Sequence, residues 1–453
     1  MIQIDFEKRM GKIKPMNGVN NGPAGEKKVK SNFIDYKRAK IPFARNHDAA
    51  YCSVYGESHT VDVSAIFPDF DADVEDESSY DFFYTDEYIK NCLAAGTETF
   101  YRLGHRIENC GLKKYGTLPP KDFLKWAKIC EHIILHYNFG WANGYDFKIR
   151  YWEIWNEPEL RPEDAIDNPT WGGTKKEFFE FFKTTAIYLK SKFPSLKIGG
   201  PALASHLDWA EEFLQTMKAH GVGLDFFSWH IYTKDPYDVL EKIYKVRKLL
   251  DRCGYEQTES ILDEWNYVID FSENYVRSIE RIIGIKGAAF SASVMNLAQN
   301  APLDLLMYYD ARLNTSLNGM FDFYTYRPLK GYYPFYMWGL LSELSDCVLC
   351  ESSDRKITAT AAIKDGKAAV MIAYFSCEEE TDLKEIPIEI KGLQVKIGKV
   401  YSLDDTHSFE KIAEFTGNRL TLNLKPDSVT FIALSKTEET IKLEEGTIWT
   451  ELK

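Results

Sequence analysis

The chain has 453 residues, of which 45% are hydrophobic and 27% are charged, as is ordinary for a soluble globular protein. This length exceeds what one hydrophobic core usually organises, so two domains are expected. The net charge of -13 excludes nucleic acid and anionic membranes as expected partners, because both need a basic patch on the protein.

The first ten residues carry no apolar run like that of a signal peptide, and no stretch approaches the roughly 20 apolar residues of a membrane span. Eight cysteines are scattered along the chain without the spacing of a disulfide framework. A cytoplasmic protein with reduced cysteines is therefore predicted. The oligomeric state stays open, with a homo-oligomer as one option.

Strand-like runs alternate with helical patterns between residues 11 and 342. The runs are centred near residues 17, 43, 100, 152, 198, 228, 262 and 307. Helical spacing of apolar residues is clearest in 122–137, 175–193, 207–220, 239–250 and 277–299. Residues 49–90 fit neither pattern and are interpreted as a long insertion. Strands alternating with helices predict a parallel sheet, and eight such units predict a (β/α)8 TIM barrel, an α/β fold.

The pattern changes after about residue 345, where short runs alternate with a period of two. Residues 357–363 and 368–375 flank Asp365-Gly366, which is typical of a β-hairpin. Residues 343–453 are therefore predicted to form a smaller all-β sandwich domain. Residues 1–10 could add a strand to it.

The most informative stretch is residues 151–159, Tyr-Trp-Glu-Ile-Trp-Asn-Glu-Pro-Glu. It begins as a strand and stops at Pro158, which has no N–H to give to a sheet. Because side chains alternate along a strand, Glu153, Trp155 and Glu157 are expected on one face. A carboxylate at such a tip, among aromatic rings, suits a proton donor to a sugar oxygen. A merely solvated acid is the alternative.

A second strand tip favours the chemical interpretation. The apolar run that starts at Ile261 ends in Glu264, followed by Trp265. Two glutamates at two strand ends are the minimum equipment for glycoside hydrolysis. Polar residues gather at the C-terminal tips of the predicted strands, where a TIM barrel carries its active face. They are Arg45, His47, Asn156, Glu157, His230, Glu264 and Asp310.

These motifs resemble glycoside hydrolase family 39 of clan A, the family of β-xylosidases and α-L-iduronidases. The resemblance covers about residues 13–340 and is most specific in residues 155–158, Trp-Asn-Glu-Pro, after the fourth predicted strand. The end of the seventh strand, at Glu264, matches as well. The resemblance implies that Glu157 is the acid/base and Glu264 the nucleophile of a retaining mechanism, with the two carboxyl groups about 5–5.5 Å apart.

The same resemblance implies a set of sugar-binding residues, to which Trp265 and Arg312 are added from their positions. The substrate-binding candidates are Arg45, His47, Asn156, His230, Tyr232, Trp265, Asp310 and Arg312. Plain alternatives exist: a structural ion pair for Arg45, packing for the histidines, and a wall residue beneath the site for Trp265. Arg312 could pair with the carboxylate of a uronic acid or lie on the surface.

Two departures from the family leave the sugar open. Ala311 and Arg312 follow Asp310, where the family's xylosidases carry an acidic, bulky run, and the insertion at 49–90 is foreign to their pattern. The prediction is a retaining exo-glycosidase, β-xylosidase-like, that removes a terminal sugar from an oligosaccharide. The same mechanism on an α-L-linked, galactoside-type or uronic-acid substrate, a transglycosylase, and a non-catalytic carbohydrate-binding barrel are the alternatives. Neither a metal nor an organic cofactor is expected.

Overall fold

Parallel strands close into a barrel in the computed structural model, which describes residues 1–26, 31–47, 61–108, 116–162, 168–313 and 315–443. Within these residues the barrel has eight strands, and neighbours in the chain are neighbours in the barrel. They are β2 (Gly18–Asn20), β3 (Phe43–Arg45), β4 (Glu98–Leu103), β5 (Tyr151–Ile154), β6 (Lys197–Leu203), β7 (Phe226–Thr233), β8 (Glu259–Tyr267) and β9 (Leu305–Tyr308). The predicted (β/α)8 barrel is confirmed.

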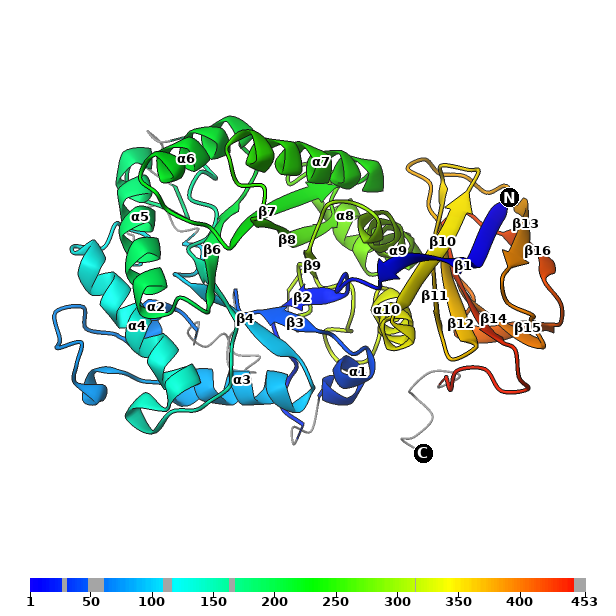
Figure 1. Cartoon of the computed structure of the whole chain (residues 1–453), viewed down its shortest axis with the longest axis horizontal. Coiled ribbons are helices and arrows are strands. Elements are labelled where there is room, and N and C mark those ends of the chain that lie inside the picture. Colours follow the sequence, from blue (N-terminus) through cyan, green and yellow to red (C-terminus); the bar gives the residue numbers. More distant parts are fainter. Residues whose placement is uncertain (27–30, 48–60, 109–115, 163–167, 314, 444–453) are drawn as a thin grey trace.

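Helices surround the barrel, as the left part of Figure 1 shows. They are α1 (Phe33–Arg38), α2 (Val63–Ile66), η1 (Glu77–Ser79), α3 (Phe83–Ala94), α4 (Phe123–Phe139), η2 (Trp141–Asn143), α5 (Lys175–Lys192), α6 (Leu207–Ala219), α7 (Pro236–Arg252), α8 (Tyr275–Ile282), α9 (Ile285–Gln299) and α10 (Tyr332–Leu344). Across the described ranges, none of them combines the length and apolar character that crossing a membrane requires.

Two predicted elements have different limits in the structure. Residues 83–94 form helix α3 ahead of β4, so the non-barrel segment is shorter than the predicted insertion at 49–90. Residues 49–60 of the predicted insertion lie outside the described part of the chain. The single helix expected over 277–299 is two helices, because the chain leaves helical geometry at Gly284 between α8 and α9.

The inside of the barrel is layered, because every second residue of a strand points inward. The layer near the N-terminal ends is an apolar cluster of Phe43, Phe100, Tyr151, Phe226, Ile261, Leu305 and Met307. Two residues further along their strands, four of these positions become Arg45, Glu153, Ser228 and Asp263, all buried. The apolar layer therefore supports a polar layer, and the polar layer supports the C-terminal face.

A separate, mostly antiparallel sheet follows the barrel. In the described residues its order is β15-β14-β17-β12-β11-β10-β1-β13-β16. The strands are β1 (Ile2–Lys12), β10 (Asp346–Ser352), β11 (Ile357–Lys364), β12 (Lys367–Tyr374), β13 (Lys384–Lys391), β14 (Ile397–Leu403), β15 (Ser408–Phe415), β16 (Arg419–Leu424) and β17 (Ser428–Ser435). Strand β1 precedes the barrel in the chain but belongs to this sheet, where it pairs with β10 and β13 (Figure 1).

One apolar cluster joins strands from both halves of this sheet. It includes Ile4 of β1, Ile372 of β12, Ile388 of β13 and Ile432 of β17. The sheet therefore curves over a shared core, as a sandwich does. Helices α9 and α10 pack against β11 and β12 and so join the sheet to the barrel. Lys286 of α9 reaches across this contact, where its Nζ donates to Ser376 O at 2.8 Å and to Asp427 Oδ2 at 3.0 Å.

Candidate active site

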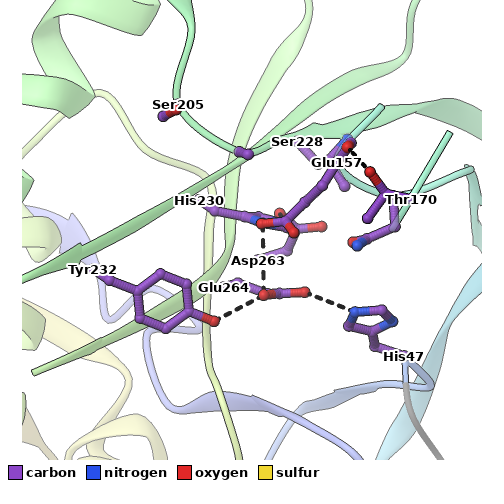
Figure 2. A network of polar contacts seen from close by, with 12 residues as sticks. His47, Glu157, Thr170, Ser205, Ser228, His230, Tyr232, Asp263 and Glu264 are labelled. Carbon is purple, nitrogen blue, oxygen red and sulfur yellow. Dashed lines mark hydrogen bonds and ion pairs between the residues drawn. The ribbon is translucent and has the colours of Figure 1, made fainter. Parts of the chain in front are cut away.

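Glu157 and Glu264 meet at the C-terminal face of the barrel, with His230 between them (Figure 2). One carboxylate oxygen of each glutamate and a ring nitrogen of His230 lie within 4.8 Å of one another. All three side chains are buried, and Glu157 is 7% exposed. The structure thus places the two predicted strand-tip glutamates together.

A β-bulge sets which residues of β8 face inward. His230 pairs with Glu264 while Trp229 pairs with Leu262, so Asp263 is an extra residue in β8. Asp263 points inward by the normal alternation from Ile261, and the bulge turns its neighbour Glu264 inward as well. Two adjacent carboxylates therefore enter the barrel.

The same bulge corrects the prediction for Trp265. Its ring is fully buried and faces the outer layer, against Phe290 of α9 at 6.1 Å and Tyr308 at 5.4 Å. Trp265 consequently supports the site from behind and does not offer a face to a sugar. Strict alternation without the bulge would have exchanged the directions of Glu264 and Trp265.

The tip of β5 also departs from strict alternation. The strand ends at Ile154, and Trp155 and Glu157 have positive φ values of 72° and 46°. Trp155 turns outward, where its Nε1 donates to Thr170 O at 2.9 Å, so it does not share the face of Glu153 as predicted. Asn156 points inward instead. Left-handed backbone at two non-glycine residues is uncommon, and such strain concentrates at functional sites.

Two backbone contacts hold Glu157 in this turn. Its N–H donates to Ala202 O at 2.9 Å, and its carbonyl accepts from Thr170 Oγ1 at 2.6 Å. Its side chain then extends to His230, with 2.8 Å between Oε1 and Nδ1.

Arg45, the last residue of β3, is the hub of the polar layer and is fully buried. Its Nε donates to Glu153 Oε2 at 2.6 Å and lies 3.2 Å from Asp263 Oδ2. Its Nη1 donates to Glu264 Oε1 at 2.7 Å, and its Nη2 donates to Asn156 Oδ1 at 2.7 Å. One rigid guanidinium therefore orients the expected nucleophile and the expected sugar-binding amide together.

The buried acids around Arg45 divide into neutral and charged groups. Burial raises the pKa of the Glu153 carboxyl well above its usual value, and Asp263 raises it further, whereas Arg45 opposes the rise. Burial acts on Asp263 in the same way, but the charge of Arg45 and the close contacts with His230 and Glu153 lower the pKa of Asp263 overall. We assign the proton to Glu153, which leaves Asp263 ionised.

The surroundings of His230 favour the protonated ring at neutral pH. Burial alone would lower the pKa of its imidazole. The charge of Glu264, with the close contact to Asp263 and the hydrogen bond to Glu157, instead raises this pKa to about 10. Burial raises the pKa of Glu264, against the opposing charges of His230 and Arg45.

Of the remaining predicted binding residues, Tyr232 and His47 contact Glu264, whereas Asp310 and Arg312 contact each other. Figure 2 shows Tyr232 and His47 directed at Glu264 from opposite sides. The Tyr232 hydroxyl donates to Glu264 Oε2 at 2.8 Å, and His47 Nε2 lies 3.3 Å from Glu264 Oε1. Asp310 is buried after β9 and accepts the Arg312 N–H at 2.5 Å. The Arg312 side chain is 27% exposed, with its Nε 3.8 Å from Asp310 Oδ2.

A metal ion would have to compete with cations already in the site. Among the described residues, only Glu157, His230 and Glu264 group closely enough to offer three ligand atoms. The carboxylates around His230 favour its protonated form, and Arg45 donates directly to Glu264. Metal ligands must be deprotonated, so this set fits a metal ion poorly.

Sequence reasoning missed Asp263 and the role of the polar layer. The position of Asp263 could have marked it as a candidate site residue, because it directly precedes Glu264 after an apolar run. Strict alternation along a strand cannot place Asp263 and Glu264 on the same face, however. The bulge that does so cannot be recognised in the sequence. Ser228, whose Oγ donates to Glu153 Oε1 at 2.5 Å, was equally unmarked.

Replacing Arg45 with methionine is expected to lower the free energy of unfolding by about 3–5 kcal/mol, because buried carboxylates would lose their shared guanidinium. Urea unfolding followed by circular dichroism measures this loss. Arg150→Met is the matched control. It removes a half-exposed guanidinium from Glu98 at the opposite end of the barrel and should cost no more than about 1 kcal/mol. Equal losses in the two variants would contradict the buried network.

The His230 cation is expected to make one part of the stability pH-dependent. Its folded-state pKa of about 10 exceeds the ordinary value of 6.5, so folding favours the protonated ring. This contribution is fully present below about pH 6.5 and is lost as the pH rises through about 10. The melting temperature of the wild type minus that of His230→Asn should therefore be largest near pH 6 and shrink toward pH 10. A difference that grows with pH would contradict the cation.

Comparison with known proteins supports the resemblance seen in the sequence. The profile of the glycosyl hydrolases family 39 matches residues 1–265. Over 244 residues the chain is 27% identical to a beta-xylosidase from Geobacillus stearothermophilus, covering 47% of this chain and 46% of that protein. Over 166 residues it is 31% identical to a beta-xylosidase from Caldicellulosiruptor saccharolyticus, covering 35% of this chain and 32% of that protein. Each match spans less than half of the relative's length.

The fold as a whole also has solved counterparts. A glucosidase from Croceicoccus marinus aligns with a TM-score of 0.78 at 19% identity, covering 96% of this chain and 99% of that chain. That likeness concerns the arrangement of barrel and sheet. The sequence profile covers more than half of this chain, including both strand-tip glutamates, so the chain belongs to glycoside hydrolase family 39.

Proposed function

We propose that the protein is a retaining exo-glycosidase that removes a terminal sugar, with Glu157 as acid/base and Glu264 as nucleophile. The observation that carries this proposal is the approach of the two carboxylates to within 4.8 Å at one barrel face. Retaining enzymes hold these groups about 5–5.5 Å apart, whereas inverting enzymes need about 6.5–9.5 Å to admit a water molecule. The short approach supports a direct attack by Glu264.

In the first step Glu157 gives its proton to the glycosidic oxygen while Glu264 attacks the anomeric carbon. The bond to the leaving group breaks, and a covalent glycosyl-enzyme forms. Arg45 and Tyr232 donate hydrogen bonds to Glu264, and His47 Nε2 lies 3.3 Å from its Oε1. These contacts fix the carboxylate, and the charge of Arg45 favours its ionised form against the effect of burial. In the second step the Glu157 carboxylate takes a proton from water, which displaces Glu264 from the sugar.

Asn156 has the right free group to bind the sugar. Its Oδ1 accepts from Arg45, which fixes the amide orientation, and its buried Nδ2 has no hydrogen-bond partner in the described part of the chain. A sugar 2-hydroxyl can accept from this Nδ2, an interaction that strengthens in the transition state. Asp310, His47 and Tyr232 supply further polar contacts from neighbouring strand tips.

A β-linked xylose is the first substrate to test, since the relatives from Geobacillus stearothermophilus and Caldicellulosiruptor saccharolyticus are both beta-xylosidases. Arg312 lies against Asp310, an internal partner for its charge, and this supports a neutral sugar over a uronic acid. Within the described ranges no disulfide joins the six cysteines. This supports a reducing compartment such as the cytoplasm, and short oligosaccharides as substrates.

A panel of aryl glycosides tests the proposal. It should include β-xyloside, α-L-arabinoside, β-galactoside, β-glucoside and β-glucuronide, together with xylobiose. Turnover of the β-xyloside is expected, with slower turnover of sugars that add a group at C5. An added sugar acceptor will reveal transglycosylation as a longer product. A protein that releases sugar from none of these substrates would contradict the proposed function.

A further inference from the structure

The ring of His230 has a carboxylate at each nitrogen. Nδ1 lies 2.8 Å from Glu157 Oε1 and 3.6 Å from Glu264 Oε2, and Nε2 lies 3.4 Å from Asp263 Oδ1. An ionised carboxylate only accepts hydrogen bonds, so a nitrogen that faces one is stabilised by carrying a proton. Two nitrogens in this position favour the imidazolium over either neutral tautomer.

Asp263 has no place in the two-glutamate mechanism, although it is fully buried at the centre of the site. The bulge in β8 supplies it beside Glu264, and Arg45 Nε, 3.2 Å from its Oδ2, holds it in place. Its second oxygen faces the His230 ring. A buried charge is expensive unless it is paired, and two cations converge on Asp263 to pair it.

We propose that Asp263 is a positioning residue for the acid/base: it keeps His230 as an imidazolium, and this confines the acid proton of Glu157 to Oε2. The Nδ1–H of the imidazolium donates a hydrogen bond to Oε1 of Glu157. The proton that Glu157 donates must then sit on the other oxygen, which is free to reach the leaving group. The catalytic role of the Glu157 proton rests on the proposed function, whereas the charge of the His230 ring can be measured without a substrate.

A neutral ring would act in the opposite way. With its proton on Nε2, its Nδ1 would accept a hydrogen bond from protonated Glu157 and draw the acid proton to Oε1. The glycosidic oxygen would then meet the wrong carboxyl oxygen. The imidazolium also stabilises the Glu157 carboxylate that remains after proton donation. The ring itself gains and loses no proton through the cycle.

The other charged groups around His230 are positive and disfavour a protonated ring. The carboxylates are therefore what stabilises the imidazolium. Lys242 of α7 approaches from outside the barrel, and its Nζ donates to the His230 carbonyl oxygen at 2.6 Å. Arg45 lies on the far side of Asp263 and Glu264. Burial disfavours the charged ring as well, and the three carboxylates outweigh it to raise the pKa of His230 to about 10. Asp263 is the one of these three that has no bond-making role.

The charge of His230 can be read by NMR on protein labelled with carbon-13 and nitrogen-15 in histidine. The chain has nine histidines, and the His230 signal is assigned by its loss in His230→Gln. In the wild type the ring should remain an imidazolium from pH 6 to pH 9. In Asp263→Asn its titration should move down by at least one pH unit. A wild-type ring that is neutral at pH 7 overturns the proposal, even if the variant fails to fold.

Leaving-group dependence tests the position of the proton. Asp263→Asn should lower kcat/KM about 10- to 100-fold for substrates whose leaving group needs protonation, and much less for a 2,4-dinitrophenyl glycoside, whose leaving group does not. Asp304→Asn is the matched control: Asp304 contacts the N–H of Ser260 at the opposite end of β8 and should change neither readout. Equal losses on both substrate types would overturn the role in proton placement. A wild type without glycosidase activity would refute the proposed function and leave the NMR result valid.

Discussion

Replacing Glu264 with alanine is expected to lower kcat by about 10⁴- to 10⁶-fold on every glycoside that the wild type cleaves. The variant lacks the oxygen that attacks the anomeric carbon, so the covalent intermediate cannot form. Arg45 and Tyr232 lie in barrel strands and His47 is buried just after β3, so all three would retain their places around an empty position. The loss should therefore appear in kcat on an otherwise folded protein.

The matched control is Glu259→Ala, at the first residue of the same strand. Glu259 pairs with Lys197 and accepts from the Tyr151 hydroxyl at 3.0 Å, at the end of the barrel away from the site. This variant should retain activity within a few-fold of the wild type. Steady-state kinetics on one active substrate compare the two variants directly. If Glu264→Ala retained wild-type turnover, Glu264 would not be the nucleophile.

Replacing Glu157 with alanine is expected to have the second largest effect, and it should depend on the leaving group. Loss of the general acid should slow cleavage by about 10²- to 10⁴-fold where the leaving group needs a proton. A 2,4-dinitrophenyl glycoside needs none, so its first step should remain fast and the intermediate should accumulate. A rapid burst of dinitrophenolate followed by slow turnover is the expected trace.

Azide distinguishes the two glutamates further. It is a small anion that attacks without a base, and it can enter the space left by either carboxylate. With Glu157→Ala it should speed turnover and yield a glycosyl azide of the substrate's own configuration, because it attacks the covalent intermediate. With Glu264→Ala any azide product should have the inverted configuration. The opposite pairing would exchange the two assigned roles.

The barrel could be predicted because its strands are buried on both faces and so stand out as short apolar runs. The strand centred near residue 262 is one example, and its polar tip correctly located Glu264. The same reasoning could not orient Trp265. A bulge of one residue reverses the faces of everything after it, and backbone hydrogen bonding, which the pattern of side chains does not reveal, decides where it occurs.

Other differences have similar local causes. The helical pattern read over 277–299 concealed the break at Gly284, because apolar residues stand on both sides of it: Ile282 is buried in α8, and α9 is buried almost throughout. Helix α3 was hidden because it begins with exposed Phe83 and Tyr84, which blur its apolar face. The polar layer of the barrel could be recognised only once the fold was known. Residues from β3, β5, β7 and β8 form one ionic network, and their separation in sequence gives no hint of it.

The stereochemistry of hydrolysis tests the roles of the two glutamates most directly. Proton NMR of the first sugar released by the wild type, recorded before mutarotation, shows whether its anomeric configuration matches that of the substrate. Retention is expected, because Glu264 and then water each invert the same carbon. A first product of inverted configuration would show that water attacks directly, and would contradict the assignment of Glu264 as the nucleophile.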